Sequence, residues 1–593
     1  KQFALTIAFS IAISAFNALT FSPMLSGLIL PKEQPRQPKG WGWIVAGVIV
    51  GLAFGKFSAN SFGNWTYVAG VLIGGFAGAN LSRIFSSFNA GFDRLQKAYA
   101  NLLERLIQAR KLVMGGLVAG IVITLLAFTA IPSAFIPEED QGYGLGIFQL
   151  QNGASLVETK KLGTQIAEVL SKETDIENAS IISGSGFNGS SPDQGLFFFG
   201  LKPLSERKGS QHSAEAIIDR LNAQLIDLSG GLAVAIGPPA VPGFSAQGGF
   251  YFQFNDLSNG SYNFNELSEM AGELIKTANA SGDFSNVYTQ FNPSSPAVGL
   301  SIDRDVMGAL NVDYQQAMDT IAVLAGGNYS GLTYESGQVR NIYVQGQAEQ
   351  RKSVDDILSS YVRSRDGELI QVSQFASADL SSAPPVISHY NLYRSILIQG
   401  AEAVGKSSGQ ALTAIQQIFN NQNFTNIGYA FTGLAALQLS AGSASVLVFG
   451  LGLLIVYLVL SAQYESYVTP VVILATVPLA MLGALAFLGI RSIDLNIYAQ
   501  VGLVTLIGLA AKNGILIVEV AEQRLEQGKT AAEAVIESAE SRLRPILMTA
   551  IAALAGFLPL VVANGAGAHS QQSLGTVIFG GLVVATVLSL IHI

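Results

Sequence analysis

The chain has 593 residues, of which 49% are hydrophobic and only 12% are charged, about half of the ~25% charged residues usual in soluble domains. This composition argues against a single soluble globule, and the absence of cysteine excludes disulfides, thiolate metal sites and cysteine nucleophiles. The formal net charge is −8, and residues 131–442 hold 30 acidic against 16 basic side chains. Such an acidic middle argues against a nucleic-acid partner, because neutralising phosphates requires clustered Lys and Arg.

Seven segments are apolar enough to be candidates for crossing a bilayer, which takes ~20 mostly apolar residues. They cover residues 3–28, 112–131, 445–461, 468–488, 497–520, 546–562 and 574–593. Two shorter runs, 43–54 and 65–81, predict an extra membrane hairpin or a re-entrant segment. The sequence opens inside an apolar run without an initiator Met and stops directly after another. We therefore expect no signal peptide and two cut ends of a longer protein.

Lys and Arg near the spans predict their direction, because short cytoplasmic flanks carry an excess of these residues. Residues 32–111 hold ten of them, nine outside the two short runs and the loop between those runs, so this stretch is predicted to be cytoplasmic. Residues 132–442 then lie outside the cytoplasm, and five closing spans return the chain to it.

The acidic middle shows strand and helix patterns in alternation. The first set has the order βαββαβ, the ferredoxin-like or split βαβ unit. Its elements are expected at residues 142–150, 155–171, 176–183, 196–201, 212–228 and 232–236. A second copy is expected from Phe250 onward, with a block around 340–393 inserted into it. Its further elements are expected at residues 266–278, 286–290, 297–303, 313–325, 396–400, 408–419 and 427–431. Two such units leave a cleft between them, and clefts between domains are common ligand sites.

Lys512 is a charged residue inside a predicted span, roughly 6 Å from its middle at 1.5 Å per residue. A charge at this depth costs ~2.5–3.5 kcal/mol on insertion scales, and intramembrane charges mark ion or proton paths. No other span carries an Asp or Glu at membrane depth, so we expect the partner carboxylate in a span outside this sequence. The alternative is a Lys that snorkels to the interface or lines a wet crevice. Asn513 beside it serves either the same path or simple helix association.

Arg542, Arg544 and Thr549 surround the start of the next span, where Pro545 suits a first helical turn. Both Arg residues fit positive-inside anchoring, which is the preferred interpretation for Arg544 and one of two for Arg542. Thr549 by itself fits a hydroxyl that bonds back to its own helix.

Long strings of this sequence resemble the carboxyl-terminal half of the resistance–nodulation–division (RND) efflux pumps, of the hydrophobe/amphiphile or acriflavine-resistance type. The strings are FIPEEDQG at 135–142, GSGFNG at 184–189, YESYVTP at 464–470, QVGLVTLIGLAAKNGILIVE at 500–519 and RLRPILMT at 542–549. The resemblance covers essentially the whole chain. It departs from the family at the 43–81 hairpin, where the typical pump has only a short amphipathic helix.

The resemblance implies a polytopic α-helical membrane protein with a large α+β extracytoplasmic insert of ferredoxin-like βαββαβ porter subdomains. It implies a sixth-span helix at 1–30, a cytoplasmic linker at 31–111 and a further span at 112–131. It implies porter subdomains at 132–255 and at 256–339 plus 395–442, a docking-domain insertion at 340–394, and five membrane helices at 443–593.

The resemblance also implies a proton relay in which Lys512, Arg542 and Thr549, with Asn513 beside the Lys, act with two Asp of the missing half. The coupling ion would be the proton, with no cofactor and no metal. The implied setting is a homotrimer in the bacterial inner membrane, with residues 132–442 in the periplasm. A periplasmic adaptor and an outer-membrane channel are the implied partners.

The implied drug path includes the glycine-rich loop at 184–195, with Gly184, Gly186, Gly189 and Gly195 as its flexible positions and Phe187 as an apolar gate. Ile182 and Phe198 match the deep pocket. Phe250, Phe252 and Phe254 alternate along one strand face and match the outer pocket. Without the resemblance, the loop fits an ordinary surface hairpin and the aromatic stripe fits a core. Ser180, Ser185 and Ser190 depart from the family pattern, which leaves the substrate range open.

Three functions compete. The first is proton-driven export of amphiphilic small molecules, and no nucleotide or nucleophile motif suggests another energy source or an enzyme. The second is a heavy-metal or lipid exporter of the same superfamily, although residues 139–269 contain no Met for a soft metal. The third is a membrane scaffold that does not pump, for which an intramembrane Lys would have no use.

Overall fold

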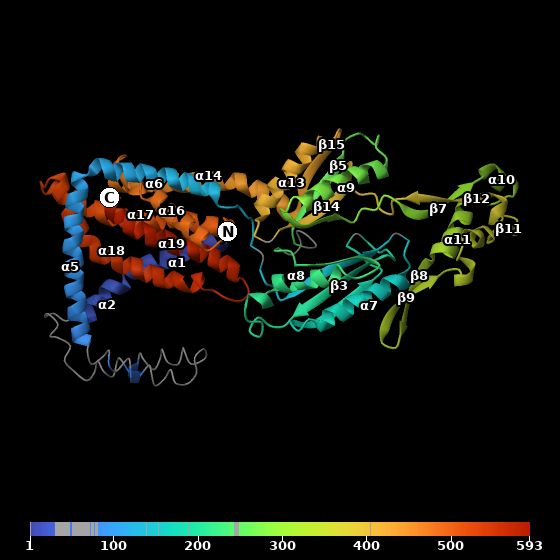
Figure 1. The fold of residues 1–593 in the computed structure, drawn as a ribbon, viewed down its shortest axis with the longest axis horizontal. Coiled ribbons are helices and arrows are strands. Elements are labelled where there is room, and N and C mark those ends of the chain that lie inside the picture. The colour runs from blue at the N-terminus through green and yellow to red at the C-terminus, as the bar shows by residue number, and fades with distance from the viewer. Residues whose placement is uncertain are drawn as a thin grey trace. The chain divides into compact units, whose positions relative to one another are not determined.

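A computed structural model of the chain describes residues 2–29, 48–49, 71–72, 76, 81–137, 139–151, 153–187, 189–241, 248–403 and 405–592 (Figure 1). The predicted hairpin at 43–81 lies almost entirely outside the described residues. The chain forms two compact units. The first comprises residues 1–110 and 519–544, and the second comprises residues 111–518 and 545–593.

The first unit contains α1 (Gln2–Leu19), α2 (Phe21–Ile29), α5 (Leu81–Gln108) and the facing ends of α17 (Ile497–Glu526) and α18 (Ala531–Val561). The helix α5 is amphipathic, and it buries Phe92, Tyr99 and Leu103 along one stripe. The guanidinium of Arg544 on α18 lies 4.7 Å from the ring centroid of Phe92. The predicted linker at 31–111 therefore ends in a long helix that α18 holds in place.

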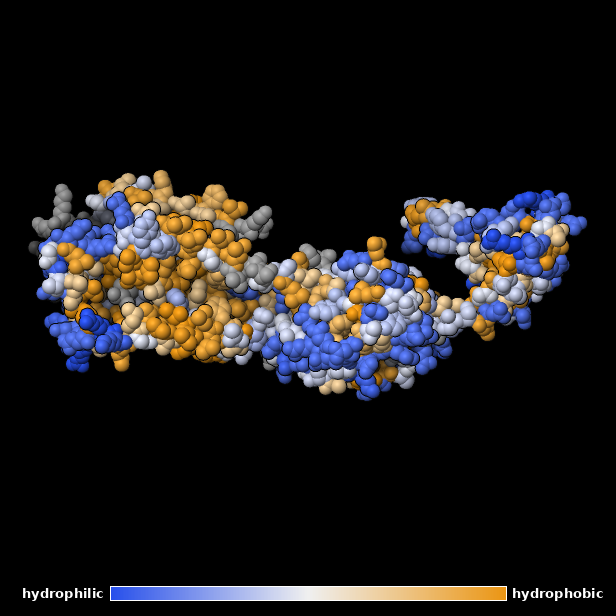
Figure 2. All heavy atoms as spheres, turned by 90° about the horizontal axis from the view of Figure 1, so that it is seen from above, coloured by the Kyte–Doolittle hydropathy of each residue, from blue (hydrophilic) through white to orange (hydrophobic). Residues whose placement is uncertain are grey.

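Seven helices in the described part of the chain are long and apolar enough to cross a membrane. They lie at Ala8–Leu28, Arg110–Ala130, Gly433–Tyr464, Thr469–Ile490, Ile497–Glu526, Ala531–Val561 and Ala568–Ile591. All seven predicted spans are found among them. Figure 2 shows hydrophobic residues gathered over this helical part of the molecule and hydrophilic ones over the sheet-rich part.

Two of these spans differ from the prediction. The helix α14 (Gly433–Tyr464) starts ten residues before the expected boundary at 443, because it continues directly from a strand of the soluble region. The span expected at 468–488 consists of α15 (Thr469–Leu474) and α16 (Val477–Ile490), each with a proline in its first turn. Proline is tolerated there because it lacks only an N–H that the helix leaves unpaired.

The first sheet of the second unit has strands β1 (Tyr143–Leu150), β2 (Ile176–Ser183), β3 (Gln194–Leu201) and β4 (Gly231–Ile236). It is antiparallel in the order β2-β3-β1-β4. The helix α7 (Leu156–Lys172) follows β1, and α8 (Ala214–Leu225) follows β3, which is the predicted element order. The two helices bury Phe148, Phe197 and Phe199 against one face of the sheet.

The second sheet repeats this order with an interruption. Its elements are β5 (Phe250–Asp256), α9 (Phe264–Ala280), β6 (Phe284–Thr289), β13 (His389–Tyr390), β14 (Tyr393–Glu402), α13 (Ser408–Gln422) and β15 (Ile427–Thr432). The strand β14 pairs with β13, β5 and β6, and β5 pairs with β15. Its order β6-β14-β5-β15 therefore matches that of the first sheet.

The interrupting block is larger than predicted. It contains β7 (Ser295–Ile302), α10 (Arg304–Ala309), α11 (Tyr314–Gly326), β8 (Asn328–Glu335), β9 (Gln338–Val344), α12 (Val354–Leu358), β10 (Tyr361–Arg363), β11 (Leu369–Gln371) and β12 (Ala376–Ala383). The strand at 295–302 and the helix at 314–326 were expected in the second βαββαβ copy. Instead β7 pairs with β12 over eight residues, and α11 packs into a separate core with Val362 and Phe375. The elements that interrupt the second sheet thus run from β7 to β12, whereas the predicted insertion covers 340–394.

Candidate functional site

Lys512 lies on α17 inside the second unit, and its side chain is exposed there. Among the described residues, no carboxylate forms an ion pair with it. Gly508, one turn earlier on the same helix face, is exposed as well. This stripe of a membrane-spanning helix is therefore open, and a cation sits on it.

Asn513, next to Lys512, has the opposite environment. It is 4% exposed, and its Nδ2 lies 3.4 Å from Ser589 Oγ on α19 (Ala568–His592). At the start of α17, Asn496 accepts from the Ala499 N–H at 3.0 Å and donates to Ser573 Oγ, also on α19, at 2.8 Å. Two amides thus hold the helix that carries Lys512 against α19. The contact of Asn513 fits the predicted alternative of helix association. No local sequence pattern indicated the role of Asn496.

The other predicted relay residues fall in different parts of the chain. Thr549 belongs to the second unit, and its hydroxyl donates to the Ile546 carbonyl of its own helix at 3.1 Å. Arg542 belongs to the first unit and is half-buried. Arg544 contacts α5 through the Phe92 ring, through Asp93 at 3.9 Å and through Asn89 at 3.5 Å. Arg544 thus packs α18 against α5.

The glycine-rich segment forms a tight loop between β2 and β3. Gly184 and Gly189 have φ values of +88° and +132°, which only glycine adopts readily. The Gly186 N–H donates to the Gly189 carbonyl at 2.8 Å, and the Gly189 N–H donates back at 3.3 Å, with the half-buried Phe187 between them. Gly195 is not part of this loop. It lies in β3, where an added Cβ would come within 2.0 Å of the Phe148 ring, so close packing explains that glycine.

A hollow of about 160 Å³ lies beside this loop. The loop lines one side with Gly189, Ser190 and Asp193, and the outward face of β14 lines the other with Leu397 and Gln399. The loop and β14 belong to the two different sheets. The cleft expected between the two βαββαβ units is therefore present, and its lining mixes polar and apolar groups.

An apolar surface covers the face of the first sheet that points away from α7 and α8. Phe198 is 37% exposed and Ile182 is 44% exposed. Strand pairing aligns Phe198 with Leu145 and aligns Ile182 with Leu196, so these four side chains share one face. Leu145 and Leu196 are buried, so the two predicted pocket residues are the exposed part of this group.

The predicted aromatic stripe on β5 has a different location. Phe252 and Phe254 are fully buried, and they pack with Phe419 of α13 at ring distances of 5.8 and 6.0 Å. Phe250 is 4% exposed and lies at the edge of a smaller hollow of about 50 Å³. The face of β5 that carries these rings is the one covered by α9 and α13. Phe252 and Phe254 are therefore core residues, with no surface left to contact a substrate.

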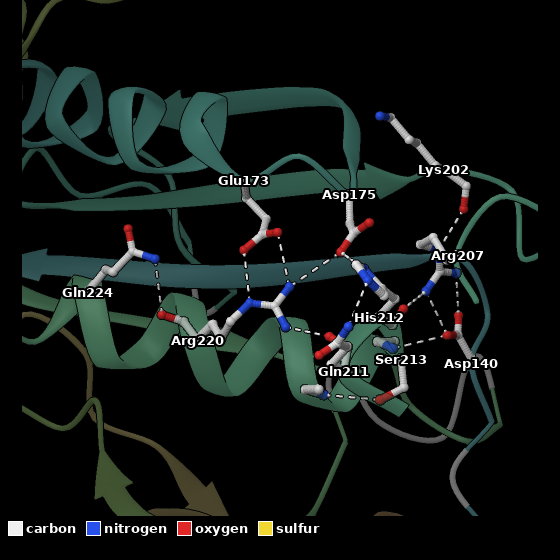
Figure 3. Close-up of polar contacts among 12 residues, drawn as sticks. Asp140, Glu173, Asp175, Lys202, Arg207, Gln211, His212, Ser213, Arg220 and Gln224 are labelled. Atoms are coloured by element: carbon white, nitrogen blue, oxygen red, sulfur yellow. Dashed lines mark hydrogen bonds and ion pairs between the residues drawn. The ribbon is translucent and has the colours of Figure 1, made fainter. Parts of the chain in front are cut away.

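A polar cluster on the first sheet was missed by the sequence patterns because its members are far apart in the chain (Figure 3). Asp140 accepts two hydrogen bonds from the fully buried guanidinium of Arg207, both at 2.9 Å, and one from the Ala214 N–H at the start of α8 at 3.0 Å. Burial raises the pKa of the Asp140 carboxyl, but the Arg207, Ala214 and Gly142 hydrogen bonds outweigh it and hold the pKa below its usual value.

A second group in the cluster joins α8 to the loop before β2. Arg220 bonds both oxygens of Glu173 at 3.0 and 3.2 Å, and His212 Nδ1 lies 2.7 Å from Asp175. The hydrogen bonds to Glu173 raise the pKa of Arg220, so the guanidinium stays charged. These contacts fix the start of α8 to the edge of the first sheet.

Replacing Asp140 by asparagine is expected to lower the stability of the protein by about 3 kcal/mol at pH 7, because the buried Arg207 charge loses its partner. Since the folded-state pKa of Asp140 is depressed, its contribution is present above the ordinary Asp pKa and is lost as pH falls through the folded value. The Tm difference between parent and D140N should therefore shrink below about pH 4. The exposed Asp227→Asn is the control, and an equal difference at pH 7 and pH 3 would contradict the assignment.

The model of the AcrB/AcrD/AcrF family matches residues 1–593. The chain belongs to that family. It is 31% identical over 599 residues to the multidrug resistance protein MdtF of Escherichia coli K12, which covers 100% of this chain and 53% of MdtF. It is 34% identical to the antibiotic efflux pump membrane transporter ArpB of Pseudomonas putida, over 85% of this chain and 48% of ArpB. It is 33% identical to the multidrug export protein AcrF of Escherichia coli K12, over 87% of this chain and 50% of AcrF.

The chain spans about half the length of these curated relatives. The predicted membership of the RND efflux pumps is confirmed. The chain is thus an inner-membrane protein of the AcrB/AcrD/AcrF family, with seven helices in its described part long and apolar enough to cross a membrane.

Proposed function

We propose that this chain supplies the second half of a proton-driven pump that exports hydrophobic and amphiphilic small molecules. The substrates would leave the periplasm or the inner membrane through an outer-membrane channel, and a homotrimer would work with a periplasmic adaptor. The observation that carries the proposal is Lys512, a cation on an open stripe of a membrane-spanning helix. A charge in that position requires a partner of opposite charge. We propose that carboxylates in the other half of the transporter, which this chain does not include, pair with Lys512.

The proposed relay works through that pairing. Two carboxylates of the other half would bind Lys512 when ionised and release it when protonated, because a neutral acid no longer offsets the ammonium. The amides of Asn513 and Asn496 tie α17 to α19, so a displacement of Lys512 would move both helices. Arg542 and Thr549 are proposed to assist at the cytoplasmic end. The proton is the coupling ion, and no cofactor is required.

We propose that the two βαββαβ units are ferredoxin-like porter subdomains and that the cleft between them admits substrate. The matching strand orders of the two sheets support this assignment. Ile182 and Phe198 offer an apolar face, and the adjacent loop around Phe187 would separate the cleft from this face. Gly184 and Gly189 would let that loop change conformation at little cost. An apolar surface beside a mixed polar cleft favours amphiphiles over small ions or sugars. The enlarged block from β7 to β12 is proposed to dock the channel.

An uncoupler should abolish this activity. In cells that carry the complete transporter and are loaded with a lipophilic fluorescent dye, efflux is expected to fall to the level of cells without the pump once the proton gradient is collapsed. Collapsing the sodium gradient is the matched control and should leave efflux intact. Efflux that persists without a proton gradient would contradict the proposed energy source, and a complete transporter that never exports dye would favour the scaffold instead.

A further inference from the structure

A short segment connects the membrane helices with the two βαββαβ sheets of the second unit. It follows α6 (Arg110–Ala130), the helix that enters the soluble region, and comprises residues 132–137 and 139–141, which we call the strap. Ser133 forms a parallel bridge with Leu495. The Leu495 N–H donates to the Pro132 carbonyl at 2.9 Å, the Ala134 N–H to the Leu495 carbonyl at 3.3 Å, and the Ile497 N–H to the Phe135 carbonyl at 3.0 Å.

The third bond joins the strap to Ile497, the first residue of α17, and the other two join it to Leu495, two residues before that helix. Lys512 lies fifteen residues farther along, about 22 Å at 1.5 Å per residue. A helix transmits an axial shift over that distance with little loss, since every turn is hydrogen-bonded to the next. A displacement at Lys512 therefore reaches the strap.

The same segment contacts the second porter subdomain. The Gly409 N–H, in the first turn of α13, donates to the Ser133 carbonyl at 3.1 Å. A Cβ at position 409 would come within 2.5 Å of that carbonyl oxygen, so only glycine permits this approach. Ser133 thus bonds to the start of α13, while its neighbours Pro132 and Ala134 bond to Leu495, just before α17.

Two acidic side chains attach the far end of the strap to two more helices. Glu139 accepts from the Ser570 N–H at 2.8 Å, the Ser570 hydroxyl at 2.7 Å and the His569 N–H at 3.3 Å, all in the first turn of α19. Asp140 accepts from the Ala214 N–H, the first residue of α8, and from Arg207 (Figure 3). Carboxylates are favourable at helix N-termini because the first N–H groups have no partner within the helix.

We propose that the strap is the coupling element that carries motion of α17 and α19 to the second helix of each porter subdomain, α8 and α13, with Glu139 and Asp140 as positioning residues. It bonds the first turns of four helices within ten positions of the sequence. Because n residues of backbone reach at most about 3.3–3.6 Å × n, the short strap limits how far the helices that it bonds can separate. This inference rests on the proposed proton-driven transport, and the experiments below distinguish its failure from the failure of that function.

The first experiment removes one attachment in the complete pump. Glu139→Gln keeps the size of the side chain but loses the charge that faces α19, and we expect dye efflux to fall roughly tenfold, within the usual range of coupling effects. Ser570→Ala removes only one of the three donors and should cause a smaller loss. The exposed Glu269→Gln on α9 is the control and should pump like the parent.

Membrane abundance, Tm and dye affinity separate coupling from folding. If Glu139 is a positioning residue, the membrane abundance and dye affinity of E139Q stay within about twofold of the parent and its Tm within a few degrees. Efflux per folded pump nevertheless falls. A variant with lower abundance but full efflux per folded pump would overturn the proposal, because Glu139 would then be purely structural. Full efflux with parental abundance would overturn it as well.

The second experiment tests whether the strap and α17 move together. This chain has no cysteine, so in a complete pump whose other half is made cysteine-free, Ser133→Cys combined with Leu495→Cys provides a specific cross-link. Paired strands lie ~4.8 Å apart, within the Cα separation that a disulfide accepts. We expect the oxidised pump to export dye as fast as the reduced one and each single-cysteine variant. Loss of efflux on oxidation with recovery on reduction, or failure of the bond to form, would overturn the proposal.

Lys512→Ala, assayed in parallel, identifies which proposal fails. Efflux that is lost in K512A but intact in E139Q would reject the strap and keep the relay. Efflux that is intact in K512A would reject the relay itself, and with it the coupling role that depends on it.

Discussion

Replacing Lys512 by alanine is expected to abolish efflux in the complete pump while leaving its amount in the membrane unchanged. The substitution removes a charge whose insertion costs ~2.5–3.5 kcal/mol, so a loss of activity would not reflect a loss of folding. Asn513 and Asn496 remain to hold α17 against α19. Dye efflux should drop to the level of cells without the pump, and the quantity of folded protein can be measured in the same membranes.

Two companion variants sharpen this result. Lys512→Arg keeps a positive charge, but a guanidinium is bulkier and presents a planar fork, so we expect most of the transport to be lost. Lys276→Ala removes an exposed Lys from α9 and should transport like the parent. Retained efflux in K512A would show that the cation merely snorkels or lines a crevice.

Adding a side chain at Gly483 is expected to prevent the membrane helices from packing. Gly483 on α16 faces α19, where an added Cβ would lie 2.4 Å from Val584 Cβ and 2.8 Å from the Gly580 carbonyl oxygen. The backbone oxygen cannot move aside, and small residues allow this close approach of two membrane helices. Gly483→Ala should cost about 1–3 kcal/mol, and Gly483→Leu should leave no folded protein.

The matched control lies on the same helix. A Cβ added at Gly489, near the end of α16, would meet no atom within 4 Å among the described residues, so Gly489→Ala should be tolerated. Thermal unfolding of detergent-solubilised protein, together with its yield from the membrane, distinguishes the two positions. Equal Tm values for G483A and G489A would show that the α16–α19 contact has room to relax.

Much of the fold could be predicted because it depends on local patterns. The seven spans follow from runs of apolar residues, since the backbone of a membrane helix satisfies its own hydrogen bonds. Ser155 and Asn263 cap the N-termini of α7 and α9 in capping boxes whose residues are three apart in sequence. The βαββαβ order of the first sheet follows from alternating periodicities in the same way. Lys512 could be identified from the sequence because it is a charged residue within a run of apolar residues.

The long-range pairings required the tertiary structure. The strand at 295–302 has the same pattern whether it joins β14 or β12, and only the pairing across about eighty residues of chain places it in the interrupting block. The alternating rings of Phe252 and Phe254 fit a pocket or a core equally well, and the position of α13 decides for the core. In sequence, Gly195 continues the glycine spacing of the preceding loop. The structure places Gly195 in β3, where the Phe148 ring packs against its backbone.

The amino-acid sequence by itself determined the membrane spans, the family and the intramembrane cation, because each depends on residue type within one segment or on long matching strings. The tertiary structure decided that Phe252 and Phe254 are core residues, where the inserted block begins, and that Glu139 and Asp140 attach one strap to α19 and α8. Those contacts join residues 74 and 431 positions apart, and no local propensity specifies such partners. They arise only when the packed helices bring their unpaired N–H groups to the same short segment.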